Sequence, residues 1–211
     1  MRDPIGDAVK RVGAGELIAY PTETVWGIGA DATSDDAVDR LRSWKGRAED
    51  SPLSILVADF ADLAPLGCRA EGAARNLAEG FWPGPLMLVV PCSRGFASGV
   101  GRADGAVGVR CSAHPLAGAL ARRCDVEGTG PITATSFNRS GGPAAANRAE
   151  AVALVAGDPD GPQIVEVETA EAGGMRESTI VDLTQAVPRV LRWGAVPPEE
   201  LEPVLARIAS P

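Results

Sequence analysis

The stretch ELIAYPTETVWGIG, residues 16–29, contains the pattern that decides the predicted fold class. Residues 16–20 are a short, mostly apolar run that predicts a buried strand, and Pro21 ends it because proline cannot donate to a strand ladder. Along the rest of the chain, similar short apolar runs alternate with alanine-rich segments of helical period. This alternation predicts an α/β domain, in which helices cover a sheet.

The predicted elements follow one another without an internal repeat. Ser34 is placed to cap a helix in which Ala37, Val38 and Leu41 share one face. Helices are predicted over residues 3–12, 35–44, 70–79, 115–122, 148–155 and 198–208. Strands are predicted over residues 16–20, 54–57, 86–90, 106–110, 131–135, 164–167, 179–183 and 189–191.

Composition and charge limit the classes of function. A length of 211 residues with 45% apolar residues suits one domain spanning 1–211, with a core built mainly from aliphatic side chains because aromatics are only 4%. The net charge of −8 favours solubility and does not attract polyanions, so the chain is not a general nucleic-acid coat. Any nucleotide or RNA site must therefore be a local basic patch.

The cysteines and the single histidine, His114, do not predict a metal site. The four cysteines are separated in sequence without a C-x-x-C pair, so zinc is not expected and they are predicted to act as small apolar residues. His114 is predicted to be structural, because no nucleophile motif accompanies it. No apolar run is long enough to cross a membrane and no signal peptide is recognised, so we expect a cytoplasmic protein with reduced thiols.

Polar residues gather where predicted elements end, which is where ligands tend to bind in α/β proteins. Lys45 and Arg47 flank a glycine after one helix and could clamp phosphates, or could simply complement the C-terminus of that helix. The loop containing Thr24 could bond a small ligand or form an ordinary proline-led turn. Both interpretations of each motif stay open on the residues alone.

Two later segments offer the same kind of choice. Residues 135–142, TSFNRSGG, combine hydroxyls, an amide and glycines that could approach phosphate, although they are not a Walker A loop; a solvated turn is the alternative. Arg110 ends the apolar run 106–109, and an arginine buried there is costly unless it is paired. Its partner could be a bound carboxylate or a structural Asp or Glu.

In their order along the chain, these motifs resemble the YrdC/TsaC family of threonylcarbamoyl-AMP synthases. The resemblance spans about residues 8–194. It is carried by YPTETVWGIG (20–29), KGR (45–47), SPLSILV (51–57), FWPGPL (81–86), VGVR (107–110), HP (114–115), TSFNRSG (135–141), ESTIVD (177–182) and VLRWG (190–194).

The resemblance implies a twisted mixed sheet with flanking helices around a concave, locally positive pocket. It implies a nucleotidyltransferase that converts ATP, L-threonine and bicarbonate into L-threonylcarbamoyl-AMP and pyrophosphate, with Mg²⁺ accompanying ATP. The product would pass to a separate transferase complex that modifies an adenosine in tRNA (t6A), and the protein itself would bind tRNA, a partly double-stranded RNA, only weakly.

The resemblance also implies roles for individual residues. The threonine side would use Thr24, Arg110 and Ser178. Lys45 and Arg47 are the expected catalytic residues, because aligning and neutralising phosphates is most of the chemistry in such a transfer. The expected nucleotide-binding set is Lys45, Arg47, Ser51, Ser136, Asn138 and Arg192, and no residue is expected to be a dedicated metal ligand.

The chain departs from the family pattern at Trp26, Phe137, Trp193 and residues 111–112. The aromatic residues Trp26 and Phe137 are expected to lie near the nucleotide and to reshape the adenine pocket. The resemblance is to the short form of the family, so the additional C-terminal domain of longer relatives is not expected.

Two other functions share this fold. One is a non-catalytic RNA-binding module, against which the retained threonine and phosphate residues argue. The other is a carbamoyl-adenylating enzyme that uses carbamoyl phosphate, which is usually one domain of a much longer chain.

Overall fold

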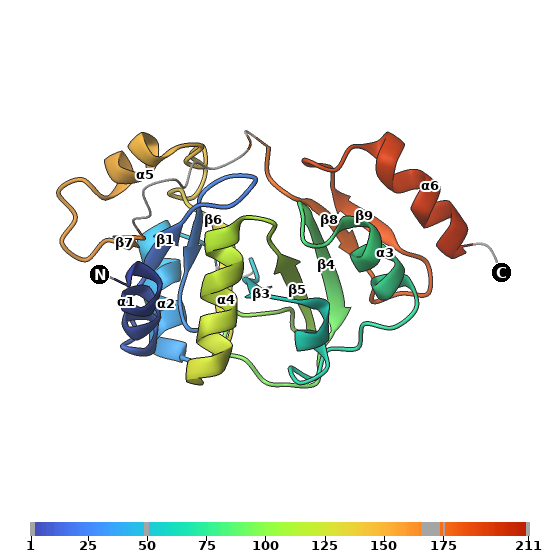
Figure 1. Ribbon diagram of the computed structural model, residues 1–211, viewed down its shortest axis with the longest axis horizontal. Helices are drawn as coiled ribbons and strands as arrows, with labels where there is room; N and C mark the ends of the chain where they lie inside the picture. Colours follow the sequence, from blue (N-terminus) through green and yellow to red (C-terminus); the bar gives the residue numbers. More distant parts are fainter. Residues whose placement is uncertain (1–2, 49–50, 166–173, 175, 210–211) are drawn as a thin grey trace.

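A single twisted sheet runs through the computed structural model, which describes residues 3–48, 51–165, 174 and 176–209 (Figure 1). Within these residues the strand order is β7-β1-β2-β6-β3-β5-β4-β8-β9. The strands are β1 (Ile18–Tyr20), β2 (Gly27–Gly29), β3 (Ser54–Val57), β4 (Leu86–Pro91), β5 (Ala106–Cys111), β6 (Ile132–Ser136), β7 (Gln163–Ile164), β8 (Thr179–Asp182) and β9 (Arg189–Arg192).

The sheet is mixed, as the resemblance implies. β1 pairs antiparallel with β2 and parallel with β7, and β6 pairs antiparallel with both β2 and β3. β5 lies between a parallel neighbour, β3, and an antiparallel one, β4, while β8 is parallel to β4 and antiparallel to β9. The predicted α/β class is confirmed.

The helices begin where side chains can cap them. Asp3 accepts from Gly6 N at 3.0 Å, Ser34 from Ala37 N at 3.3 Å, and Asn147 from Glu150 N at 3.0 Å, each satisfying a backbone donor of the first turn. The described helices are α1 (Pro4–Gly13), α2 (Asp35–Lys45), α3 (Ala73–Phe81), α4 (Pro115–Glu127), α5 (Arg148–Val155), α6 (Pro198–Ala209) and the 3-10 helix η1 (Phe60–Leu63).

In the first half of the molecule, apolar side chains form two cores, one on each face of the sheet. Ile18 and Tyr20 of β1 pack on one face with α1 and α4. Ala19, between them in sequence, packs on the opposite face with α2 and α5, because successive side chains of a strand point to opposite faces. Helices therefore cover both faces of this half of the sheet (Figure 1).

The second half of the sheet is covered differently. Leu86, Leu88 and Val90 of β4 pack in one apolar cluster that includes residues of α3 and α6. The intervening residues, Met87 and Val89, point to the other face and line a cavity. The sheet face opposite α3 and α6 is thus the floor of the site.

Several element boundaries differ from the sequence prediction. β2 was not predicted. A Cβ on Gly27 would lie 2.9 Å from the Tyr20 ring, so glycine is needed where this ring crosses the strand. α4 runs five residues past the predicted end and stops at Gly128, whose φ of 73° suits glycine. α3 spans Ala73–Phe81 instead of 70–79. β7 is Gln163–Ile164, and residues 166–167 of the predicted strand lie outside the described residues.

Candidate active site

A cavity of about 390 Å³ lies on the exposed face of β3, β4, β5 and β8, a volume typical of small-molecule sites. Its floor comes from alternate strand residues, among them Ser54, Met87, Gly108 and Ile180. Its charged lining consists of four arginines and one carboxylate, which are Arg47, Arg102, Arg110, Arg192 and Glu177. The locally positive, concave pocket implied by the resemblance is therefore present in a chain whose net charge is −8.

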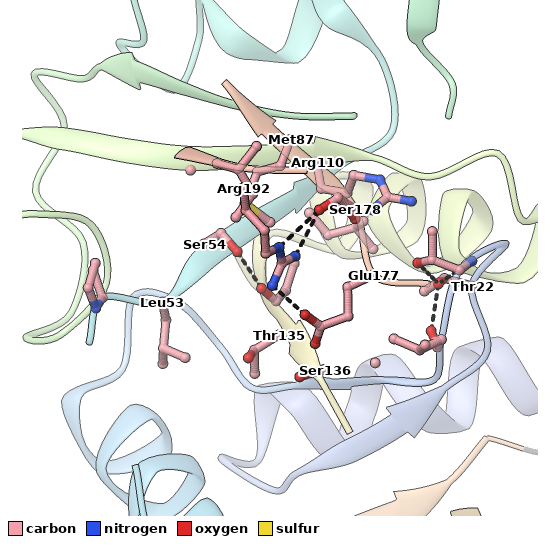
Figure 2. Close-up of a pocket in the computed structure, with 18 of the residues that line it drawn as sticks. Thr22, Leu53, Ser54, Met87, Arg110, Thr135, Ser136, Glu177, Ser178 and Arg192 are labelled. Atoms are coloured by element: carbon pink, nitrogen blue, oxygen red, sulfur yellow. Dashed lines mark hydrogen bonds and ion pairs between the residues drawn. The ribbon is translucent and has the colours of Figure 1, made fainter. Parts of the chain in front are cut away.

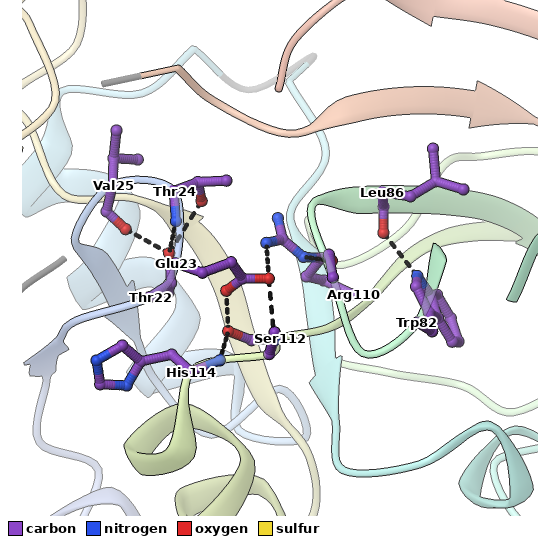
Figure 3. Close-up of polar contacts among 11 residues, drawn as sticks. Thr22, Glu23, Thr24, Val25, Trp82, Leu86, Arg110, Ser112 and His114 are labelled. Carbon is purple, nitrogen blue, oxygen red and sulfur yellow. Dashed lines mark hydrogen bonds and ion pairs between the residues drawn. The ribbon is translucent and has the colours of Figure 1, made fainter. Parts of the chain in front are cut away.

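Arg110 stands at one end of the cavity, on β5, and is almost fully buried. Its Nε donates to the Gly84 carbonyl at 2.8 Å, and its Nη2 donates to Glu23 Oε1 at 2.7 Å (Figure 3). Gly84 N donates a hydrogen bond to the Cys111 carbonyl, which fixes the turn that contains Gly84. Arg110 is therefore held in one orientation by a backbone carbonyl and a carboxylate.

Glu23 is bound from three sides. Besides Arg110, the hydroxyl of Ser112 donates to its carboxylate, and Ala113 N donates at 2.9 Å. Burial alone would raise the pKa of Glu23, but the Arg110 charge and these hydrogen bonds bring that pKa below its ordinary value. The carboxylate therefore stays ionised and neutralises Arg110, so the open structural alternative for Arg110, an ion pair, is realised here.

Hydroxyl groups line the same end of the cavity. Thr22 Oγ1 donates to the Val25 carbonyl at 2.6 Å and accepts from Thr24 N at 3.1 Å, so the turn after Pro21 is closed by its own side chain. The Thr24 hydroxyl lies 2.9 Å from that of Thr22. Ser178, directly before β8, lines the cavity as well. These groups suit a small polar ligand.

The other end of the cavity carries Arg47 and Arg192. Arg47 donates to the carbonyls of Ser51 and Pro52, each at 3.0 Å, and reaches Thr135 Oγ1 at 3.4 Å. Arg192 donates to the Ser178 carbonyl from Nε at 3.1 Å and from Nη2 at 2.9 Å.

Glu177 is the carboxylate at this end. It forms an ion pair with Arg192 Nη1, and Figure 2 shows its side chain directed toward the Thr135 and Ser136 side of the pocket. Gly194 permits this arrangement, because a Cβ there would lie 2.2 Å from the Glu177 carbonyl oxygen. The carboxylate of Glu177 therefore already pairs with one of the arginines at this end of the cavity.

Lys45 lies behind this end, with 3% of its surface exposed. Its Nζ donates to the Ser136 carbonyl and to Asn138, at 3.1 Å to the carbonyl and 2.8 Å to Oδ1. Asn138 Oδ1 also accepts from the Ser136 hydroxyl at 2.9 Å, and its Nδ2 donates to the carbonyls of Arg139 and Gly142. Lys45 thus organises the loop that follows β6.

Burial is the main influence on both cations of the KGR motif. It lowers the pKa of Lys45 to about 8, with a further contribution from the charge of Arg47 and a smaller opposing one from Glu177. It also lowers the pKa of Arg47, again opposed by Glu177. Both charged forms are therefore disfavoured in the free protein, and a bound anion would favour them.

The structure separates the residues expected in the site into two groups. Those that line the cavity are Thr24, Arg47, Arg110, Ser136, Ser178 and Arg192. Lys45, Ser51 and Asn138 do not line it; Lys45 and Asn138 support Ser136, and the Ser51 carbonyl holds Arg47. Their contact with a nucleotide stays a prediction.

Sequence reasoning missed several charged or hydroxyl residues of the site, among them Thr22, Glu23, Arg102 and Glu177. Glu23, Thr22 and Glu177 were quoted within motifs but received no role, and Arg102 was not considered. Arg102 lines the cavity while paired with Asp182 at 2.6 Å. No local signal pointed to Glu23, because Glu177 lies nearer to Arg110 in sequence and only the fold selects Glu23 as the partner of Arg110.

The aromatic departures need a correction. Phe137 is fully buried and stacks on Trp44, with ring centroids 5.2 Å apart, so its side chain does not line the cavity as expected of a residue near the nucleotide. Trp26 does line the cavity, and its buried Nε1 has no hydrogen-bond partner within the described part of the chain. Trp193 is 43% exposed and is not among the lining residues.

His114 has the structural role predicted for it. It is the N-cap of α4, and its Nδ1 accepts from Leu116 N at 3.2 Å (Figure 3 shows its place beside Ser112). Among the described residues, no group of three or more His, Cys, Asp or Glu side chains could hold a metal ion, and no helix is long and apolar enough to cross a membrane.

Comparison with known families assigns this architecture. The Sua5/YciO/YrdC family model, described as telomere recombination, matches residues 10–194. The chain belongs to the Sua5/YciO/YrdC family. The family resemblance found in the motifs is thereby confirmed.

Several curated relatives are named threonylcarbamoyl-AMP synthase. A Mycobacterium tuberculosis protein named putative threonylcarbamoyl-AMP synthase is 39% identical over 201 residues, which are 95% of this chain and 88% of that protein. The threonylcarbamoyl-AMP synthase of Bacillus subtilis is 38% identical over 98% of this chain and 58% of its own length. Against that longer relative, this chain spans little more than half.

A solved structure of the family has a ligand. Sua5 of Pyrococcus abyssi in complex with L-threonine superposes with a TM-score of 0.85 at 36% identity, covering 97% of this chain and 58% of that one. Escherichia coli YciO superposes with a TM-score of 0.75 at 20% identity, covering 93% and 91%, and supports the fold alone.

Proposed function

We propose that this protein is an L-threonylcarbamoyladenylate synthase, a nucleotidyltransferase that makes threonylcarbamoyl-AMP and pyrophosphate from ATP, L-threonine and bicarbonate. The observation that carries the proposal is one cavity with two different ends. Arg110 is held by Glu23, from the turn of Thr22 and Thr24, at one end. Arg47 and Arg192 both lie near Glu177 at the other. The names of the curated relatives and the L-threonine bound to Pyrococcus abyssi Sua5 support this choice of substrates.

Each end fits one substrate. The guanidinium of Arg110 would receive the threonine carboxylate, and the hydroxyls of Thr24 and Ser178 would bond its amino and hydroxyl groups. Arg47 and Arg192 would hold phosphate oxygens, with Ser136 beside them, while Lys45 and Asn138 keep that loop in place.

Alignment supplies most of the rate in such a reaction. The amine of threonine forms a bond to the carbon of bicarbonate, water leaves, and a carbamate results. A carbamate oxygen then attacks the α-phosphorus of ATP while pyrophosphate leaves. The protein need only orient the carbamate in line with the leaving group, neutralise phosphate charge and exclude water. The described cavity residues contain no nucleophile–histidine pair, and this chemistry needs none.

Mg²⁺ would enter with ATP. The two carboxylates nearest the site are already engaged, Glu23 by Arg110 and Glu177 by Arg192, so the described residues offer no all-protein cage. Phosphate oxygens and water are the usual ligands of Mg²⁺ in nucleotide sites. The ion would supply charge neutralisation on the triphosphate.

The wider setting is part of the same proposal. The adenylate would be consumed by a separate threonylcarbamoyl transferase complex that modifies tRNA, in the cytoplasm. Because the net charge of the protein is −8, its own affinity for tRNA, or for double-stranded RNA in general, would be weak and strongly dependent on salt.

Pyrophosphate release by the purified protein tests the proposal. ATP and Mg²⁺ are supplied with threonine and bicarbonate together, with either one omitted, or with carbamoyl phosphate instead, and the product is identified by mass. We expect release only when threonine and bicarbonate are both present. Release driven by carbamoyl phosphate alone, or tRNA binding by folded protein without any turnover, would contradict the proposal.

A further inference from the structure

Cys68 and Cys92 lie side by side although 24 positions separate them, with their Sγ atoms 2.6 Å apart. The spacing of the cysteines along the chain does not predict this proximity. Both side chains also face the Leu66 carbonyl, with Cys92 Sγ at 3.0 Å from its oxygen. The pair lies at the edge of the apolar cluster under α3.

The backbone sets the two cysteines directly opposite each other. They form an isolated antiparallel bridge, flanked by hydrogen bonds from Arg69 N to the Pro91 carbonyl at 2.8 Å and from Ser93 N to the Gly67 carbonyl at 2.9 Å. This is the non-hydrogen-bonded type of pair, whose Cα atoms lie about 4.5 Å apart and whose side chains are closest. Disulfides span Cα separations of roughly 4.4–6.8 Å, so a bond can form without moving the backbone.

We propose that Cys68 and Cys92 are an oxidisable dithiol that closes into an intramolecular disulfide. The oxidant is a low-molecular-weight disulfide such as oxidised glutathione. Cys92, which is half-buried, attacks one sulfur of that molecule and releases one reduced thiol, leaving a mixed disulfide on Cys92. Cys68 then gives up its proton and attacks Cys92 Sγ, which releases the second reduced thiol and leaves the internal disulfide.

The other two cysteines lack this arrangement. Cys111 and Cys124 are buried, and within the described residues neither has a second sulfur in hydrogen-bond range. Burial raises the pKa of Cys111 to about 11 and also raises the pKa of Cys124, so both are protonated at neutral pH. They serve as internal controls for the pair.

The second step of the exchange should be slow. Burial, followed by the hydrogen bond with Cys92, raises the pKa of Cys68, so little of it is thiolate near neutral pH. Raising the pH should therefore speed closure. Once formed, the bond would close a loop that contains α3 and all of β4, whose Met87 and Val89 line the cavity.

Incubation of reduced protein in glutathione buffers of increasing oxidising strength tests the proposal. Trypsin cleaves after Arg69, Arg75 and Arg94, so the two cysteines fall in different peptides and a bond between them is identified by mass. We expect one linked peptide pair lighter by two hydrogen atoms and a rise in Tm on the order of 5–10 °C. In Cys68→Ala, Cys92 should instead retain a glutathione adduct, while Cys124→Ala should behave as the wild type.

Three results would overturn the proposal. They are four free thiols under strongly oxidising buffer, a stable glutathione adduct on wild-type Cys92, and linkage through Cys111 or Cys124. Because thiols are counted without substrates, none of these results depends on the proposed enzyme activity.

Discussion

The two ends of the cavity differ in how their cations are balanced. At the end that we assign to threonine (the threonine end), Arg110 is paired at 2.7 Å with Glu23, which is itself bound by Ser112 and Ala113. At the end that we assign to ATP phosphates (the phosphate end), burial lowers the pKa values of Lys45 and Arg47, and Glu177, which pairs with Arg192, only partly opposes this.

This difference assigns a different task to each end. A neutral, rigid pair orients a ligand and adds little net attraction, whereas incompletely balanced buried cations gain most from an arriving polyanion. The threonine end should therefore determine which amino acid binds, and the phosphate end should determine how fast the adenylate forms.

Arg47→Ala should have the largest effect. Removing a guanidinium from the phosphate end should lower kcat for pyrophosphate release by about 100- to 1,000-fold, the scale of losing one charge-stabilising donor. Arg40→Ala, on the exposed side of α2, is the matched control and should leave the rate unchanged. A wild-type rate in Arg47→Ala would contradict the proposal that Arg47 binds phosphate.

Arg110→Ala should raise KM for threonine by roughly 30- to 100-fold and change KM for ATP far less, because a buried charged hydrogen bond to the ligand carboxylate is lost. Initial rates at varied threonine and varied ATP separate the two constants. A defect confined to ATP would place the carboxylate elsewhere.

Glu23→Gln should raise KM for threonine by about 10-fold, because Arg110 would be held less firmly in position. The amide keeps the shape of the side chain but loses its charge. The variant should also lose stability most clearly above the ordinary carboxylate pKa of 4.5, where wild-type Glu23 is ionised and paired. Thermal unfolding at pH 7 and pH 4 measures this. Equal changes in both substrate constants would indicate a general structural defect instead.

Lys45 should give the smallest effect, a few-fold change with pH. ATP favours the protonated lysine, so apparent ATP affinity should fall as pH rises above about 8. Stability of the free protein should change in the opposite sense: between pH 8 and the ordinary pKa of 10.5 the unfolded chain binds more protons, so unfolding becomes harder as pH rises. Lys45→Met should abolish both trends, and their persistence in that variant would assign them to another group.

The sequence predicted most of the elements because alternating apolar runs and capping residues such as Ser34 act locally. It missed β2, because the Tyr20 ring that requires Gly27 is brought there by the fold. The sequence indicated polar site residues at the ends of elements, but the floor of the cavity is formed by residues within the strands. Met87 and Val89 could not be recognised as lining residues, since β4 is apolar on both faces.

Pairing between distant positions was the other limit. Arg110 was expected to need a carboxylate, but Glu23 lies 87 positions away and only tertiary structure brings the two together. Phe137 was expected near the nucleotide because it adjoins Ser136, yet neighbouring residues of an extended chain point to opposite faces, and Phe137 faces Trp44.

Calorimetric titration tests the division of the cavity most directly, with L-threonine and ATP–Mg²⁺ measured separately on the wild type, Arg110→Ala and Arg47→Ala. We expect a crossed result: Arg110→Ala loses threonine binding and keeps ATP binding, while Arg47→Ala loses ATP binding and keeps threonine binding. Parallel loss of both ligands in both folded variants would contradict it, because the cavity would then act as one undivided site.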